Sequence, residues 1–191
     1  MSEPLTLGFD TSAAHCAAAL LCGDQILVVR AEEMGRGQAE RLIPLLEEVL
    51  DEAYVAWRDL AGIGVGIGPG NFTGIRISVA TARGLALSLG IPANGISTLE
   101  AIRTGHEHGT PCVPAPRGQG YVQHAAQVPE LVAMADIVDA VLPPAPALLA
   151  ERIARLAFLA PSNEPTPAPL YVRPADAAPA KDTPPVILDD T

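Results

Sequence analysis

The chain has 191 residues, 49% of them hydrophobic and only 4% aromatic, which predicts a sizeable core built mainly from Ala, Leu, Val and Ile. Its net charge of −10 and its single lysine, Lys181, exclude the basic surface that direct nucleic-acid binding usually needs. No apolar run reaches the roughly 18 to 20 residues of a membrane span. Three cysteines without a CxxC pair, and a start without a basic signal-peptide segment, indicate a cytoplasmic protein.

Three strand-like segments come first in the chain. The segments "LTLGFDTS", "CAAALL" and "QILVVRAEE" are joined by short turns, which predicts an antiparallel meander. From Gln38 to Ala53, apolar residues recur at helical spacing and acids occupy the other face, so an amphipathic helix is expected. Pro44 falls within this pattern, and the regular helix therefore begins near Ile43 or is kinked there.

A glycine-rich loop separates the next two predicted elements. A buried strand is expected from Ile63 to Ile67 and a helix from Ile75 to Leu89, with Gly90 as its C-terminal cap. "IPANGIS" predicts another strand, and Thr98 to Arg103 another helix. The order βββαβα, in which an antiparallel meander feeds a parallel crossover, indicates an α/β fold.

Beyond Gly105 the patterns weaken. "TPCVPAPRGQGYVQHAAQ" is compatible with two short strands, Ala147 to Leu159 predicts a helix, and "PLYVR" is a candidate strand or docking segment. The chain therefore divides into a first lobe (1–104), a short second lobe (105–173) and a proline-rich tail (174–191) that is expected to be disordered.

The loop "GIGPGNFTGIR", residues 66–76, raises the question of nucleotide binding. It lacks the lysine of a Walker A loop, and it fails the dinucleotide fingerprint at Asn71, where a third glycine is needed. The favoured interpretation is that its glycines supply positive φ angles and close packing between strand and helix. Asp10-Thr11-Ser12 also has two interpretations: Asp10 positions a metal-bound water beside a phosphate, or Asp10 and Ser12 close a local turn. The second is favoured because the following "AAHC" has no glycine.

No catalytic or metal-binding set emerges from the remaining polar residues. His106 and His108 match no zinc signature and are expected in a solvated loop. The two helices that flank the glycine loop offer another function, because their apolar and small residues either pack internally or form a flat surface for another subunit. The interface hypothesis names Leu42, Leu45, Leu46, Val49, Ile75, Ser78, Val79, Ala82 and Ala86.

Three segments resemble the bacterial TsaB family, also called YeaZ: "LGFDTSAAHCAAALL", "GIGPGNFTGIRISVATARGLALSLGIPANGISTLEA" and "PLYVRP". The resemblance implies an actin and sugar-kinase-like fold of the ribonuclease H-like class. It also implies a role in making N6-threonylcarbamoyladenosine beside the tRNA anticodon. The motif residues that carry it are Asp10, Thr11, Ser12, Gly68, Pro69, Gly70, Phe72, Thr73, Gly74 and Arg76.

The same resemblance implies a scaffold and activator rather than a catalyst. TsaB pairs with its paralogue TsaD, which transfers the threonylcarbamoyl group, and the ATPase TsaE joins them. A homodimer is expected when the chain is alone, tRNA is reached only through the complex, and no cofactor is expected, although a nucleotide at a subunit interface is possible. TsaD-like proteins carry an H-x-x-x-H metal-binding pair, and Thr98 and Ile102 occupy its positions here.

Two departures from the family pattern bear on the alternatives. Where family members often show a D-A-R-R-x-E-V-Y-like segment, Pro114 stands at the Asp position and Gln119 at the Glu position, which puts any role of those acids in doubt. The short second lobe also argues against ATP binding between two full lobes. The alternatives are a small ATPase or kinase of the same superfamily, and a protein similar to the M22 metallopeptidases.

Overall fold

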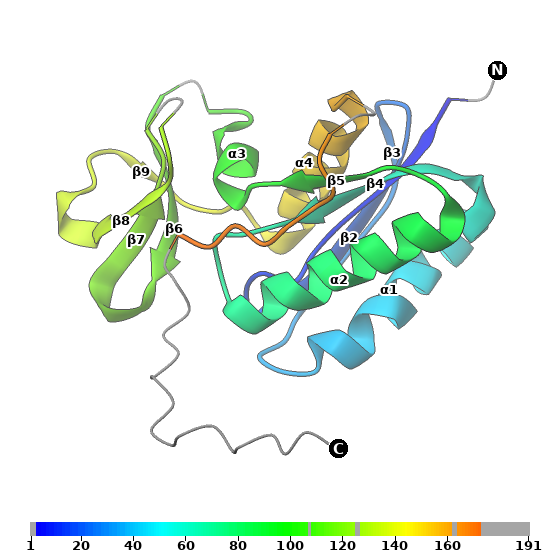
Figure 1. Ribbon diagram of the computed structural model, residues 1–191, viewed down its shortest axis with the longest axis horizontal. Coiled ribbons are helices and arrows are strands. Elements are labelled where there is room, and N and C mark those ends of the chain that lie inside the picture. The colour runs from blue at the N-terminus through cyan, green and yellow to red at the C-terminus, as the bar shows by residue number, and fades with distance from the viewer. Residues whose placement is uncertain (1–2, 107, 125–126, 162–163, 173–191) are drawn as a thin grey trace, which may run out of the picture.

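The computed structural model describes residues 3–106, 108–124, 127–161 and 164–172, so the predicted tail lies outside the described residues. Two sheets of unequal size organise the chain (Figure 1). Five strands form the first sheet, in the order β3-β2-β1-β4-β5, and four form the second, in the order β8-β7-β6-β9. Within the described ranges, none of the helices combines the length and the apolar character that a membrane crossing requires.

The first sheet confirms the predicted meander and crossover. β1 (Leu5–Asp10), β2 (His15–Cys22) and β3 (Gln25–Glu33) pair antiparallel in chain order. β4 (Leu60–Gly66) runs parallel to β1, and β5 (Ala93–Ile96) runs parallel to β4. The carboxyl ends of β1, β4 and β5 therefore meet at one edge, the edge at which open α/β sheets usually place their functional loops.

Two helices cover one face of this sheet (Figure 1). α1 (Gln38–Glu52) is one helix that contains Pro44, so the prediction that it begins near Ile43 is wrong. Pro44 lies on the exposed face of α1. α2 (Phe72–Leu89) begins three residues earlier than predicted, because the Asn71 side chain caps it by accepting the Gly74 N–H at 2.9 Å.

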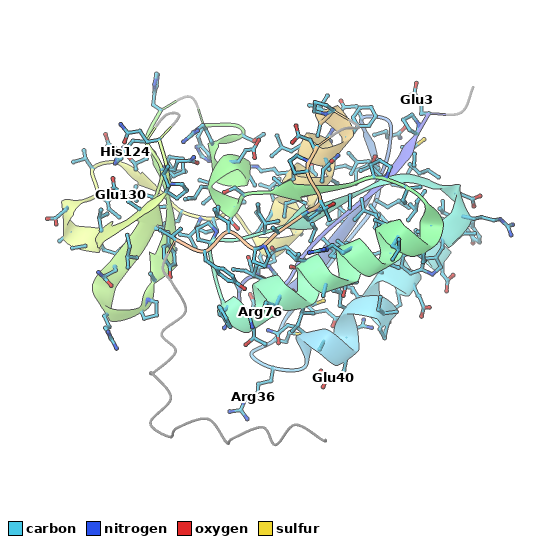
Figure 2. The ribbon with its side chains drawn as sticks, viewed as in Figure 1. Glu3, Arg36, Glu40, Arg76, His124 and Glu130 are labelled. Carbon is cyan, nitrogen blue, oxygen red and sulfur yellow. The ribbon has the colours of Figure 1, made fainter. Side chains whose placement is uncertain are left out.

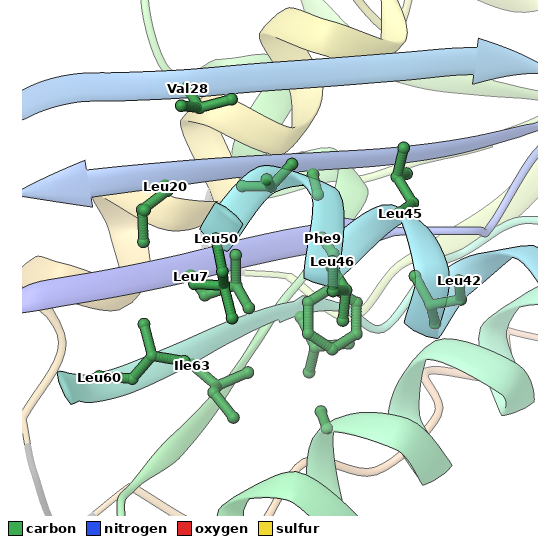
Figure 3. Close-up of a cluster of buried hydrophobic side chains, with 14 of the residues drawn as sticks. Leu7, Phe9, Leu20, Val28, Leu42, Leu45, Leu46, Leu50, Leu60 and Ile63 are labelled. Atoms are coloured by element: carbon green, nitrogen blue, oxygen red, sulfur yellow. The ribbon is translucent and has the colours of Figure 1, made fainter. Parts of the chain in front are cut away.

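The interface hypothesis is wrong for most of the residues it names. Figure 3 shows the leucines of α1 lying against Leu7, Phe9 and Ile63 of the sheet. A side chain buried under its own sheet cannot contact another subunit, so internal packing is the correct alternative. Eight of the nine residues are at most 3% exposed, and Ala86 is half-buried: the eight are Leu42, Leu45, Leu46, Val49, Ile75, Ser78, Val79 and Ala82.

A third long helix, α4 (Pro146–Leu159), covers the opposite face of the first sheet. Its alanines approach the strands closely, because a Cβ built on Gly8 would lie 2.6 Å from the Cβ of Ala154. A Cβ built on Gly64 would be equally close to Ala157. Glycines of the sheet that face alanines of α4 thus allow the helix to pack closely on this face of the sheet without aromatic side chains.

The second sheet is formed by short strands: β6 (Thr110–Ala115), β7 (Gln119–Val122), β8 (Glu130–Ala133) and β9 (Ala140–Val141). The last two were not predicted, because strands of four and two residues carry too little periodicity to detect. α3 (Thr98–Arg103) packs against this sheet. Three single-turn 3₁₀ helices complete the described elements: Trp57–Asp59, Pro116–Gly118 and Met134–Asp136.

Residues 164–172, here called the strap, return from α4 across β5 (Figure 1). Pro167 is buried against Gly95, and the Leu170 N–H donates to the Ile67 carbonyl at 2.9 Å. The "PLYVR" segment therefore docks through residues 169–172 without forming a strand, and Arg173 lies outside the described residues. The strap brings the far end of the described chain beside the glycine loop.

Candidate functional site

The two motif segments meet at the carboxyl ends of β1 and β4. The Thr11 hydroxyl donates to the Gly74 carbonyl at 2.7 Å, and the Asn71 N–H donates to the Ser12 carbonyl at 2.6 Å. One bond runs in each direction between the Asp-Thr-Ser turn and the glycine loop. Together they fasten the first turn of α2 to the end of β1.

The glycines of the loop stand where the two backbones nearly touch. A Cβ built on Gly74 would lie 1.9 Å from the Thr11 carbonyl oxygen, and one on Gly70 would lie 2.3 Å from that of Ser12. Gly68 has a φ of 91°, a conformation that side chains disfavour, and it precedes a cis peptide bond. Close approach and positive φ account for these glycines without any ligand.

Asp10 is completely buried at the centre of the site. Its Oδ2 accepts hydrogen bonds from the Ser12 N–H and the Ser12 hydroxyl, both at 2.9 Å, and lies 2.7 Å from the Nε2 of His15. Sequence reasoning identified the Asp10–Ser12 turn but missed His15. The only available signal was its position at the start of β2, directly after the turn.

The remaining oxygen of Asp10 is enclosed rather than open. Oδ1 lies over Gly66, where an added Cβ would be only 1.9 Å away, and it has no hydrogen-bond partner among the described residues. With Oδ2 engaged by three groups, the carboxylate holds the β1–β2 turn closed. Within the described ranges, no group of three or more His, Cys, Asp or Glu side chains is placed to hold a metal ion.

The positions that correspond to the H-x-x-x-H pair lie inside the core. Thr98 and Ile102 are buried on α3, and Ile102 packs with Leu99 and Val113 beneath the second sheet. The Thr98 N–H donates to the Gly68 carbonyl at 2.9 Å, so this residue braces the glycine loop. The three remaining histidines are exposed and are not part of this site: His106, His108 and His124.

An aromatic and cationic cluster lies at the surface beside the loop. The rings of Phe72 and Tyr171 stack with centroids 5.2 Å apart, and the Arg76 Cζ lies 3.9 Å from the Phe72 centroid. The Arg76 Nε donates to the Tyr171 hydroxyl at 2.7 Å. Figure 2 shows Arg76 near the first turn of α2. Sequence reasoning named Phe72 and Arg76 as motif residues but missed Tyr171, which is 95 residues away from Arg76 in the chain.

Two hollows border these elements. One, of about 540 Å³, lies between the strap, β5 and α4, and Ile67 and Leu156 are among the residues that line it. The other, of about 360 Å³, lies between the first turns of α1 and α2, where Arg36 and Thr73 line it. Neither is lined by Asp10, so the buried carboxylate does not open into either hollow.

The cysteines are expected to react very unequally. The pKa of the Cys16 thiol is raised from 9.0 to about 12, chiefly by burial and also by the nearby Glu32 and Asp10 carboxylates, while Arg41 acts in the opposite direction. Iodoacetamide at pH 8 should therefore alkylate the half-buried Cys22 first and leave Cys16 intact, as peptide mass spectrometry would show. Labelling of Cys16 as fast as Cys22 in the native protein, rather than only in urea, would contradict this.

The raised pKa of Cys16 makes the free energy of unfolding decrease at alkaline pH. Because the folded pKa of Cys16 exceeds 9.0, its contribution to stability is complete below pH 9 and is lost as the pH rises toward about 12. Burial also raises the pKa of Cys112. A denaturation midpoint measured across this range should fall less steeply in Cys16→Ala than in the unaltered chain.

Comparisons with known proteins agree on one family. A family model described as "TsaD: tRNA N6-adenosine threonylcarbamoyltransferase" matches residues 29–148. The tRNA threonylcarbamoyladenosine biosynthesis protein TsaB of Buchnera aphidicola is 37% identical over 98 residues, which is 51% of this chain and 46% of that protein. The TsaB protein of Bacillus subtilis is 34% identical over 119 residues, or 60% and 52%. The chain thus spans about half the length of these curated relatives.

A solved structure shows the same architecture. YeaZ from Pseudomonas aeruginosa superposes with a TM-score of 0.60 at 27% identity, covering 71% of this chain and 69% of that one. The fold is therefore the actin and sugar-kinase-like α/β fold predicted from the sequence.

Proposed function

The chain belongs to the family of TsaD-type domains that includes the TsaB and YeaZ proteins, and from this premise we propose that it is a non-catalytic subunit of tRNA N6-threonylcarbamoyladenosine modification. It would act in the cytoplasm as a scaffold and activator that binds a TsaD homologue, which is later joined by a TsaE homologue. It would meet tRNA only through the assembled complex.

One observation carries the non-catalytic part of the proposal. The positions of the H-x-x-x-H pair are held by Thr98 and Ile102, whose side chains are buried in the packing of α3. Neither side chain can replace an imidazole ligand, and neither position opens to a substrate. The loop that would serve a nucleotide is instead fastened to the Asp10 turn by its own hydrogen bonds. These hydrogen bonds support the proposal that the glycine loop has a structural role in this chain.

The partner surface is proposed to lie on the exposed side of α2. Exposed residues recur there at helical spacing, and the small residues Ala80 and Gly84 permit close helix approach. Leu87 is 87% exposed, which leaves apolar surface available for a second subunit. We call this surface the outer α2 face and define it as Arg76, Ala80, Arg83, Gly84 and Leu87.

Leu87→Asp is expected to weaken binding to a co-expressed TsaD homologue by about tenfold or more, because it places a charge in the apolar part of the contact. Calorimetric titration of the purified proteins measures the loss. Leu159→Asp is the matched control, since Leu159 is 75% exposed on α4, which covers the opposite face of the sheet. Equal affinities for the two variants would rule out the outer α2 face as the interface.

The kinase alternative has a separate test. Beside the glycine loop, the feature that favours a magnesium–nucleotide site is the Oδ1 of Asp10, which has no hydrogen-bond partner among the described residues. Magnesium-dependent ATP binding by the isolated chain, lost in Asp10→Ala, would favour that alternative over the scaffold. The enclosure of Oδ1 against Gly66 leads us to expect no such binding.

A further inference from the structure

Arg76 presents its guanidinium group in a fixed orientation at the surface. Its plane is held over the Phe72 ring, at 3.9 Å from Cζ to the ring centroid, and its Nε is tied to the Tyr171 hydroxyl. The two terminal nitrogens, Nη1 and Nη2, have no hydrogen-bond partner among the described residues. An arginine held in this way loses little side-chain entropy when it binds an anion, so binding is favoured in advance.

Several other arginines of the chain are paired with carboxylates. Arg41 bonds Glu32 at 2.8 Å and Glu48 at 2.7 Å, and Arg155 pairs with Glu151 at 3.0 Å. Arg30 likewise pairs with Glu52. The lack of an ion pair does not by itself distinguish Arg76, because Arg83 and Arg152 also pair with no described carboxylate. Arg76 is distinguished by the aromatic ring and the tyrosine hydroxyl that hold its guanidinium group.

The surroundings of Arg76 favour a protein as its partner. Phe72 and Tyr171 are each about two-fifths exposed, so apolar ring surface borders the cation. Arginine beside aromatic rings is the composition that dominates binding energy at protein interfaces. One face of the Phe72 ring is already covered by Arg76, which leaves a poorer platform for stacking a nucleobase. The net negative charge also opposes a polyanion.

We propose that Arg76 docks a carboxylate of the partner protein, with Phe72 and Tyr171 packing against apolar side chains around that acid. The proposal rests on the proposed function, because Arg76 begins the outer α2 face. Two parallel N–H donors can bind both carboxylate oxygens at once. The strap thereby becomes part of the partner surface: Tyr171 acts as a positioning residue that fixes the guanidinium.

The test compares the unaltered chain with three variants by calorimetric titration against the TsaD homologue. Arg76→Gln should weaken binding about 10- to 100-fold, the loss expected when a charged hydrogen-bonded pair is broken at an interface. Tyr171→Phe should weaken it by only a few-fold, because the ring stack remains. Arg58→Gln is the matched control: its side chain is 88% exposed, at the Trp57–Asp59 turn, and it should bind like the unaltered chain.

Salt dependence separates docking from a purely structural role. The loss caused by Arg76→Gln should shrink as salt is raised from about 0.05 to 0.5 M, because screening weakens the ion pair in the unaltered complex. A loss that is equal at both salt concentrations would mean that Arg76 only anchors the strap, and would overturn the proposal. Unchanged protein affinity with weaker tRNA binding by the assembled complex would overturn it in favour of an RNA contact.

The outcomes also separate the docking role of Arg76 from the proposed scaffold function. If the unaltered chain binds the TsaD homologue and Arg76→Gln binds as tightly as Arg58→Gln, the docking role fails while the scaffold function stands. If the unaltered chain does not bind the TsaD homologue at all, the scaffold function fails first.

Discussion

Leu46→Glu is expected to unfold most of the protein, with a loss in the free energy of unfolding of about 5 kcal/mol or more. Leu46 is completely buried between α1 and the first sheet. The substitution removes a leucine from a packed core and puts a carboxylate there without a hydrogen-bonding partner. Losses of this size approach the whole stability of many single domains, which is about 5 to 15 kcal/mol.

The matched substitution on the same helix is Ile43→Glu. Ile43 is 38% exposed, so a glutamate there can remain in water, and the expected loss is about 1 kcal/mol or less. Urea denaturation followed by circular dichroism measures both. A folded Leu46→Glu protein with an unchanged midpoint would show that the α1 leucines do not form the core, and would restore them as interface candidates.

Gly74→Ala is expected to destabilise the protein by about 2 to 4 kcal/mol, although alanine is the better helix former. The helical preference favours alanine by only about 1 kcal/mol. Against it, the new Cβ would lie 1.9 Å from the Thr11 carbonyl oxygen, so the backbone of the Asp10 turn must move. That movement costs about 3 kcal/mol through overpacking, and it weakens the Thr11 bond to the Gly74 carbonyl.

Gly84 supplies the control within α2. A Cβ built there meets nothing within 4 Å, so Gly84→Ala should stabilise the chain by up to about 1 kcal/mol. The same alanine substitution therefore has opposite signs at two positions of one helix. Thermal and urea unfolding of both variants measures the difference. A stabilised Gly74→Ala protein would mean that the turn and the loop are not in contact.

Most of the first sheet was predictable because its elements, apart from the four-residue β5, are long enough to show their own period. The stripe of α1 and the meander of β1, β2 and β3 needed no knowledge of distant partners. Pro44 misled the prediction of the helix start, because local preference was weighed without the packing that holds α1 together. The helical periodicity identified the apolar face of α1. It did not show whether that face packs on the chain's own sheet or on another subunit, and for this reason core residues were predicted as interface.

The site was predictable only in its local part. The turn formed by Asp10 and Ser12 depends on neighbours in the chain, and its favoured interpretation agrees with the hydrogen bonds at Oδ2. His15 and Tyr171 were missed because their partners are set by strand pairing and by the path of the strap. The glycines were recognised, but the atoms they make room for are carbonyl oxygens of another segment.

That last feature changes what a glycine-rich signature records. In a nucleotide-binding protein the empty Cβ positions leave space for phosphate, whereas here the chain's own backbone fills them. The sequence motif is the same in both cases, because glycine is required wherever a side chain would clash. It does not matter to the motif whether the neighbouring group is a ligand or a peptide group. A glycine-rich loop of this kind therefore shows only that other atoms pack closely against its backbone. Whether the loop binds a ligand depends on which atoms those are.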